Sequence, residues 1–87
     1  SKIQRGQTQV TVTTANGYNN YNIDFPVPFD STPSAILVSL ASGTTDTNYK
    51  NFTVMSINHT ATGFRARILN GGSATGHQPY INWVAIK

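Results

Sequence analysis

The feature that most constrains this chain of 87 residues is a series of short segments in which apolar and polar residues alternate. An alternation with a period of two places successive side chains on opposite faces of a β-strand. No stretch has the spacing of apolar residues that an amphipathic helix needs. Glycine, asparagine and proline separate the segments, as turn residues do between strands. The pattern therefore predicts an all-β domain, built as a sandwich or a barrel.

Six antiparallel strands are predicted, at residues 8–14, 18–25, 34–41, 51–58, 64–69 and 80–87. Val10 and Val12 are expected on one face of the first strand, and Trp83 in the core. Both faces of residues 34–41 carry apolar side chains, which predicts that a partner surface covers the second face. Residues 42–48 are expected to form a polar loop, and residues 70–76 the most flexible loop, because it is rich in glycine.

The short chain predicts an oligomer. A single domain of this size buries only about 60–65% of its unfolded surface, so its core needs support. Disulfides are excluded because the chain has no cysteine. No metal or other cofactor is expected either, since the only acidic residues and the only histidines are too few to form a ligand cluster: Asp24, Asp30, Asp46, His59 and His77.

The charge distribution argues against nucleic acid and membrane partners. The formal net charge of +3 reflects scarce acids, and the basic residues are scattered along the chain. A phosphate-binding stripe needs clustered cations. No segment is long and apolar enough for membrane insertion. We expect one domain over residues 1–87, taken from a longer protein, with weakly charged surfaces.

The chain carries an ordered set of motifs: Phe25-Pro-Val-Pro-Phe29, Pro33-Ser-Ala-Ile-Leu-Val-Ser-Leu40, Asn48-Tyr-Lys50, Val54-Met-Ser-Ile-Asn58, Thr62-Gly-Phe64 and Tyr80-Ile-Asn-Trp-Val-Ala-Ile86. Together they resemble the H-type lectin family, whose members bind sugars and occur in invertebrate agglutinins and in phage tail proteins. The resemblance implies a six-stranded antiparallel β-sandwich that assembles as a homotrimer, with sugar sites near the subunit interfaces.

The resemblance also implies site residues. Lys50 matches the basic residue of the family's binding motif, and His77 corresponds approximately to an aromatic residue in the loop before the last strand. Gly71 and Gly72 stand where the family has an aromatic residue and a histidine. Sugars need aromatic faces and planar polar groups. The expected sugar-binding residues are therefore Lys50, His77 and Asn70, with Tyr49 or Tyr80 as the ring platform.

Arg65 and Arg67 lie two residues apart and are expected to face outward with Leu69. One interpretation is that their charges protect the edge of a sheet. The other, which we favour, places both arginines at the trimer interface, where they donate hydrogen bonds across a symmetry axis.

The leading functional hypothesis is a carbohydrate-binding, receptor-recognition module of a trimeric phage tail fibre, located in the virion tail or outside cells. Its partner would be a cell-surface glycan. The alternative is a structural trimerisation cap without a ligand, which the Gly71-Gly72 loop favours. An enzyme is not expected: no nucleophile-elbow sequence is present, and a catalytic carboxylate pocket would have to form between subunits.

Overall fold

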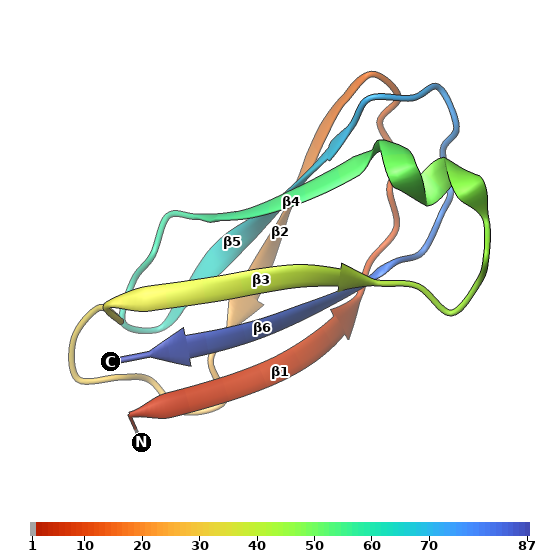
Figure 1. Ribbon diagram of the computed structural model, residues 1–87. Helices are drawn as coiled ribbons and strands as arrows, with labels where there is room; N and C mark the ends of the chain where they lie inside the picture. The colour runs from red at the N-terminus through yellow and green to blue at the C-terminus, as the bar shows by residue number, and fades with distance from the viewer. Residues whose placement is uncertain (1) are drawn as a thin grey trace.

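A computed structural model describes residues 2–87; Ser1, the first residue of the expected domain, lies outside the described residues. Two three-stranded antiparallel sheets pack face to face (Figure 1). One sheet has the order β1-β6-β3, with β1 at Ile3–Gln9, β6 at Tyr80–Ile86 and β3 at Ala35–Ala41. The other has the order β2-β5-β4, with β2 at Gly17–Asp24, β5 at Gly63–Asn70 and β4 at Phe52–Ile57. The predicted six-stranded β-sandwich is confirmed.

The first strand differs from the prediction. A strand over residues 8–14 is wrong, because β1 begins at Ile3 and ends at Gln9. Val10 and Val12 are buried, but they lie in an irregular segment whose backbone N–H groups donate to the carbonyl oxygens of Pro79 and His77 at 3.0 and 2.9 Å. Pro79 has no N–H to donate in return, so the regular pairing with β6 stops at Tyr80.

Trp83 lies in the core between the sheets, as predicted, with 5% of its surface exposed. Its ring centroid is 5.6 Å from that of Phe25 and 5.9 Å from that of Phe64. The indole also covers Gly6, its partner in the β1–β6 register. A Cβ at position 6 would lie 2.6 Å from the indole Cζ2, so only glycine fits there without displacing the ring.

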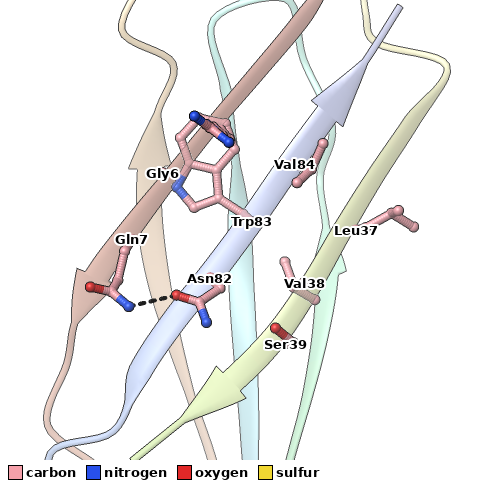
Figure 2. Close-up of a pocket in the computed structure, with 9 residues that line it drawn as sticks. Gly6, Gln7, Leu37, Val38, Ser39, Asn82, Trp83 and Val84 are labelled. Carbon is pink, nitrogen blue, oxygen red and sulfur yellow. Dashed lines mark hydrogen bonds between the residues drawn. The ribbon is translucent and has the colours of Figure 1, made fainter.

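The two outer faces of the sandwich differ in character. The outer face of the β1-β6-β3 sheet, here called the apolar face, has one charged side chain, Arg5, among its outward-facing strand residues. Leu37 is 60% exposed, so the cover expected over residues 34–41 is not supplied by the chain itself. Figure 2 shows Leu37, Val84 and Asn82 on this face, with the Gln7 amide donating to Asn82 Oδ1 at 2.8 Å.

The outer face of the β2-β5-β4 sheet, here called the arginine face, carries Arg65 and Arg67. Both project from β5, the middle strand, so the interpretation of edge protection is wrong. Tyr18, Met55 and Leu69 surround them and are all exposed.

The two ends of the sandwich are formed by different segments of the chain (Figure 1). The start of β1 and the end of β6 lie together, and the backbone N–H of Lys87 donates to the Lys2 carbonyl at 2.8 Å. The opposite end holds residues 10–16, 42–46 and 71–79, together with the short 3₁₀ helix η1 at Thr47–Asn51. Within residues 2–87, no helix has the length and apolar character needed to cross a membrane.

Candidate functional site

A depression of about 400 Å³ lies at the η1 end of the sandwich. It brings together three of the predicted sugar-binding residues: Tyr49, His77 and Tyr80. Gln9, Asp46 and Gln78 line it as well. We call this feature the η1 depression. Both tyrosines are partly exposed, so their rings are available at its surface.

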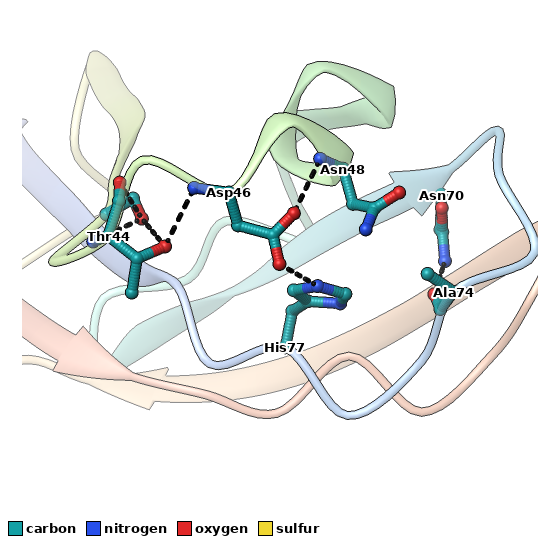
Figure 3. Close-up of polar contacts among 7 residues, drawn as sticks. Thr44, Asp46, Asn48, Asn70, Ala74 and His77 are labelled. Carbon is teal, nitrogen blue, oxygen red and sulfur yellow. Dashed lines mark hydrogen bonds and ion pairs between the residues drawn. The ribbon is translucent and has the colours of Figure 1, made fainter.

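Asp46 organises the wall of the η1 depression. It caps η1, and its Oδ1 accepts a hydrogen bond from the backbone N–H of Asn48 at 2.9 Å (Figure 3). The sequence predicts only a polar loop at the position where η1 begins. The helix forms there because the Asp46 side chain accepts a hydrogen bond from a free backbone N–H of the first turn. The Asn48 N–H, and then the hydrogen bond from His77, hold the pKa of the Asp46 carboxyl below its usual value.

His77 is held from several sides. Its Nε2 lies 2.9 Å from Asp46 Oδ2 and donates to this carboxylate. The ring centroid of Tyr49 is 5.3 Å away and that of Phe52 is 5.9 Å away, both in edge-on arrangements. Nδ1 is buried and has no hydrogen-bond partner within residues 2–87. Since neither ring nitrogen is open to a ligand, His77 acts in this arrangement by orienting Asp46 and Tyr49, whereas a direct contact was expected.

The Asp46 contacts predict a pH dependence of the η1 end. Because the folded-state pKa lies below the reference value of 3.8, the stabilisation is present above that value and is lost as the pH falls through the folded-state pKa. We expect the Asn48 amide resonance to titrate with a midpoint below 3.8, and this titration to disappear in Asp46→Asn. An NMR pH series measures both. A midpoint at or above the reference value would contradict the cap geometry.

Asn70 does not contact the η1 depression. It is 3% exposed, and its Nδ2 donates to the carbonyl oxygens of Thr14 at 3.1 Å and Ala74 at 2.8 Å. Its Oδ1 accepts from the Gly72 N–H at 2.9 Å. Figure 3 shows the bond to Ala74. These bonds use both amide hydrogens, so the structure gives Asn70 a structural role in place of the predicted ligand contact.

The loop that was expected to be the most flexible is tied to its neighbours. Besides the Asn70 bonds, the Gly71 N–H donates to the Asn51 carbonyl at 2.9 Å, and the Gly72 carbonyl accepts from the Asn16 N–H at 2.9 Å. The loop therefore has a defined path beside η1, which positions residues 76–78 at the depression.

Asn70→Ala is expected to destabilise the domain by about 1–3 kcal/mol, because it leaves buried main-chain groups without partners. Urea denaturation at a fixed protein concentration measures the loss. Asn58→Ala is not a suitable comparison, since Asn58 has a positive φ of 53°. Asn48→Ala is the better control because its side chain is exposed. Equal stability of the two variants would show that the Asn70 network contributes little.

The remaining predicted residues lie elsewhere. Lys50 is exposed on η1, next to Tyr49 in sequence, and is not among the residues that line the η1 depression. Arg65 and Arg67 lie on the arginine face.

Sequence reasoning missed Gln9, Asp46 and Gln78 as candidate ligand contacts. Gln9 is paired with Tyr80 in the β1–β6 register, and its Nε2 donates to the Gln78 carbonyl at 3.2 Å. The misplaced first strand hid this pairing. For Asp46, the available signal was an aspartate before a polar stretch, which is typical of a helix N-cap.

The chemistry of the η1 depression suits a neutral, hydroxylated ligand. Tyrosine rings offer apolar faces, carboxylate oxygens accept from hydroxyl pairs, and glutamine amides both donate and accept. The Asp46–His77 pair does not form a triad with a hydroxyl nucleophile, because His77 Nδ1 contacts no hydroxyl in the described part of the chain. Among residues 2–87, no group of three or more acidic or histidine side chains forms a metal-binding cluster.

Solved structures share this fold. The R1-type pyocin tail fiber, in an N-truncated form, is 20% identical with a TM-score of 0.80, and the match covers 98% of this chain and 69% of that one. The tailspike gp61 of Pseudomonas phage phi297 is 20% identical with a TM-score of 0.78, covering 98% of this chain and 15% of that one. Discoidin II of Dictyostelium discoideum is 21% identical with a TM-score of 0.77, covering 98% of this chain and 36% of that one.

At these identities the structural matches establish a common fold. They also show that the chain spans only a small part of the tailspike and of discoidin II. A comparison with curated protein sequences finds no significant match. The sequence does match, over residues 3–86, the family described as "Putative tail fiber protein gp53-like, C-terminal". The chain therefore belongs to this family of C-terminal tail fiber domains, which places it in the tail of a phage or phage-like particle.

Proposed function

We propose that this domain is a receptor-recognition module that binds a carbohydrate of the host surface in the η1 depression, without catalysing a reaction. The observation that supports this most directly is the grouping of Tyr49 and Tyr80 with the Asp46 carboxylate. A sugar ring stacked on a tyrosine would place its hydroxyl groups beside oxygen acceptors and amide donors. Membership of a tail fiber family supports a role at the host surface.

We further propose that three copies assemble through the apolar face. A depression of about 530 Å³ lies on this face, and Leu37, Val38 and Val84 are among its lining residues. Packing the arginine face around a three-fold axis would instead bring six guanidinium groups together (two from each copy), which is unfavourable without matching carboxylates. The interface predicted at Arg65 and Arg67 is thus the competing arrangement. A trimer would raise the apparent affinity for a repetitive glycan by about 10²–10⁴-fold.

A glycan array, probed with the assembled domain, tests carbohydrate binding. We expect a consistent response to one class of sugar, and Tyr49→Ala and Tyr80→Ala each to weaken it about ten-fold, because each removes a stacking ring worth roughly 1–2 kcal/mol. Val27→Ala is the control, since Val27 is an exposed apolar residue that lies outside both the η1 depression and the arginine face. Lys50→Ala tests separately the basic residue implied by the family resemblance.

Two results would count against the proposal. An intact oligomer that binds no glycan on the array, and none prepared from host cells, would favour the alternative of a structural trimerisation cap. Binding that is retained at full strength in both Tyr49→Ala and Tyr80→Ala would move the carbohydrate site away from the η1 depression.

A further inference from the structure

The arginine face holds two guanidinium groups in fixed positions. Arg65 and Arg67 are two residues apart on β5, so their Cα atoms are about 6.5–7 Å apart on the same face. Each is paired in register with an asparagine of β2. Arg65 Nε donates to Asn22 Oδ1 at 3.1 Å, and Arg67 Nε donates to Asn20 Oδ1 at 2.9 Å. The two side chains are therefore oriented in the same way by equivalent contacts.

Arg67 has a second support. Its Cζ lies 4.1 Å from the centroid of the Tyr18 ring, a stacking arrangement that restricts the side chain further. A guanidinium group has five N–H donors, and the asparagine contact uses only the Nε–H. Within residues 2–87, the Nη groups of both arginines make no hydrogen bond or ion pair. Both arginine side chains are thus held in place, while most of their N–H donors have no partner within residues 2–87.

The surrounding charge does not balance these cations. Of the acidic residues, Asp46 pairs with His77 and Asp30 pairs with Lys87. Asp24 is the remaining carboxylate; it follows Asn22 on the same face of β2 and borders a small polar depression together with Arg65. One carboxylate cannot neutralise two guanidinium groups, so the arginine face keeps an excess of positive charge.

We propose that the arginine face binds an anionic oxygen group, a phosphate or a carboxylate, carried by a surface polysaccharide of the host. This inference rests on the proposed function, and it assigns a second site and an acidic substrate class. Arginine suits such groups because its N–H donors match two oxygens at once. Since Asn20, Asn22 and Tyr18 already restrict the side chains, binding costs less conformational entropy than it would for free arginines.

An NMR titration of the ¹⁵N-labelled domain tests this assignment, with glucose 6-phosphate, glucuronate, inorganic phosphate and glucose as the probes at constant ionic strength. We expect glucose 6-phosphate to shift the backbone amides of residues 20–22 and 65–67, and glucose to leave them unchanged. In Arg65→Gln/Arg67→Gln the apparent affinity should fall at least ten-fold. Arg5→Gln is the matched control, because it removes an exposed arginine from the apolar face and should leave the response intact.

A second double variant separates recognition by the guanidinium shape from misfolding and from the loss of positive charge. Arg65→Lys/Arg67→Lys keeps both positive charges but removes the planar fork, so a response that is weaker than in the natural chain and stronger than in the glutamine variant supports bidentate recognition. The response should also persist in Tyr49→Ala, since that residue belongs to the η1 depression. A wrong assignment of the carbohydrate site to the η1 depression and a wrong assignment of the anion site to the arginine face would therefore give different results.

Three outcomes would overturn the inference. The first is no shift of the β2 and β5 amides with any of the three anions, glucose 6-phosphate, glucuronate and inorganic phosphate. The second is a tighter response to inorganic phosphate than to glucose 6-phosphate, which would exclude the sugar-linked source. The third is dissociation of the oligomer both in Asp24→Asn and in Arg65→Gln/Arg67→Gln. This result would show that the guanidinium groups are paired with groups of neighbouring copies.

Discussion

Leu37→Lys is expected to convert the proposed trimer into monomers that remain folded. Leu37 is 60% exposed in the single chain, and it lies across β6 from Arg5 through the pairs Arg5–Val84 and Leu37–Val84. In a packed apolar face, a lysine here would bury a charge beside another cation of the same sign. Size-exclusion chromatography with light scattering gives the mass directly.

Met55→Lys is the matched control for this change. Met55 is 41% exposed, also lies on a sheet, and is opposite Arg67 on the arginine face. We expect it to leave the oligomer intact. The reverse pattern, dissociation in Met55→Lys and an unchanged mass in Leu37→Lys, would show that the chain assembles through the arginine face and would confirm the interface predicted from the sequence.

The Leu37→Lys monomer should also bind host cells far more weakly. Its η1 depression is untouched, so the affinity for a single soluble sugar should stay within about two-fold. Binding to a multivalent surface should fall by about 10²–10⁴-fold, because two further sites no longer act together. Equal losses for soluble sugar and for cells would mean that the η1 depression is completed by a neighbouring subunit.

Trp83→Ala is expected to reduce the free energy of unfolding by about 3–5 kcal/mol. A small domain has a total stability of only about 5–15 kcal/mol, so the variant would be partly unfolded at physiological temperature. The reason is geometric as well as hydrophobic: the indole fills the space between Phe25 and Phe64 and covers the Gly6 backbone. No neighbouring side chain can enter that volume from position 6.

Urea denaturation followed by circular dichroism measures this loss, at one protein concentration because oligomerisation shifts apparent stability. Val27→Ala serves as the control, since its side chain is 57% exposed and its removal should change the stability by less than about 0.5 kcal/mol. A Trp83→Ala variant within about 1 kcal/mol of the natural chain would mean that the sheets collapse to fill the cavity.

The fold was largely predictable because strand periodicity is a local signal. The alternation in residues 63–70 and 80–86 identifies both the buried residues and the outward-facing Arg65 and Arg67. The first strand was misplaced since Val10 and Val12 alternate as a strand would. Their backbone N–H groups donate to the carbonyl oxygens of Pro79 and His77, which are distant in sequence, so periodicity alone could not show that the regular ladder ends before Val10.

The candidate site was predictable only in part, because its geometry depends on contacts between distant segments. The aromatic character of Tyr49 and Tyr80 indicates possible ring platforms. The contact between Asp46 and His77 joins segments that are 31 residues apart, and the sequence gives no sign of it. Asn70 shows the opposite error: its amide is typical of a ligand contact, yet burial directs all of its hydrogen bonds inward.

The adjacency of Lys2 and Lys87 sets the orientation of the domain within any larger assembly. Polypeptide that continues from either terminus must leave from the end opposite η1 (Figure 1). The sandwich measures 41 Å along its longest axis, which separates such a connection from the η1 depression by most of the length of the domain. Attached to a shaft in this way, the domain would point Tyr49, Asp46 and Tyr80 outward along the fiber axis, toward the surface that the tip meets first.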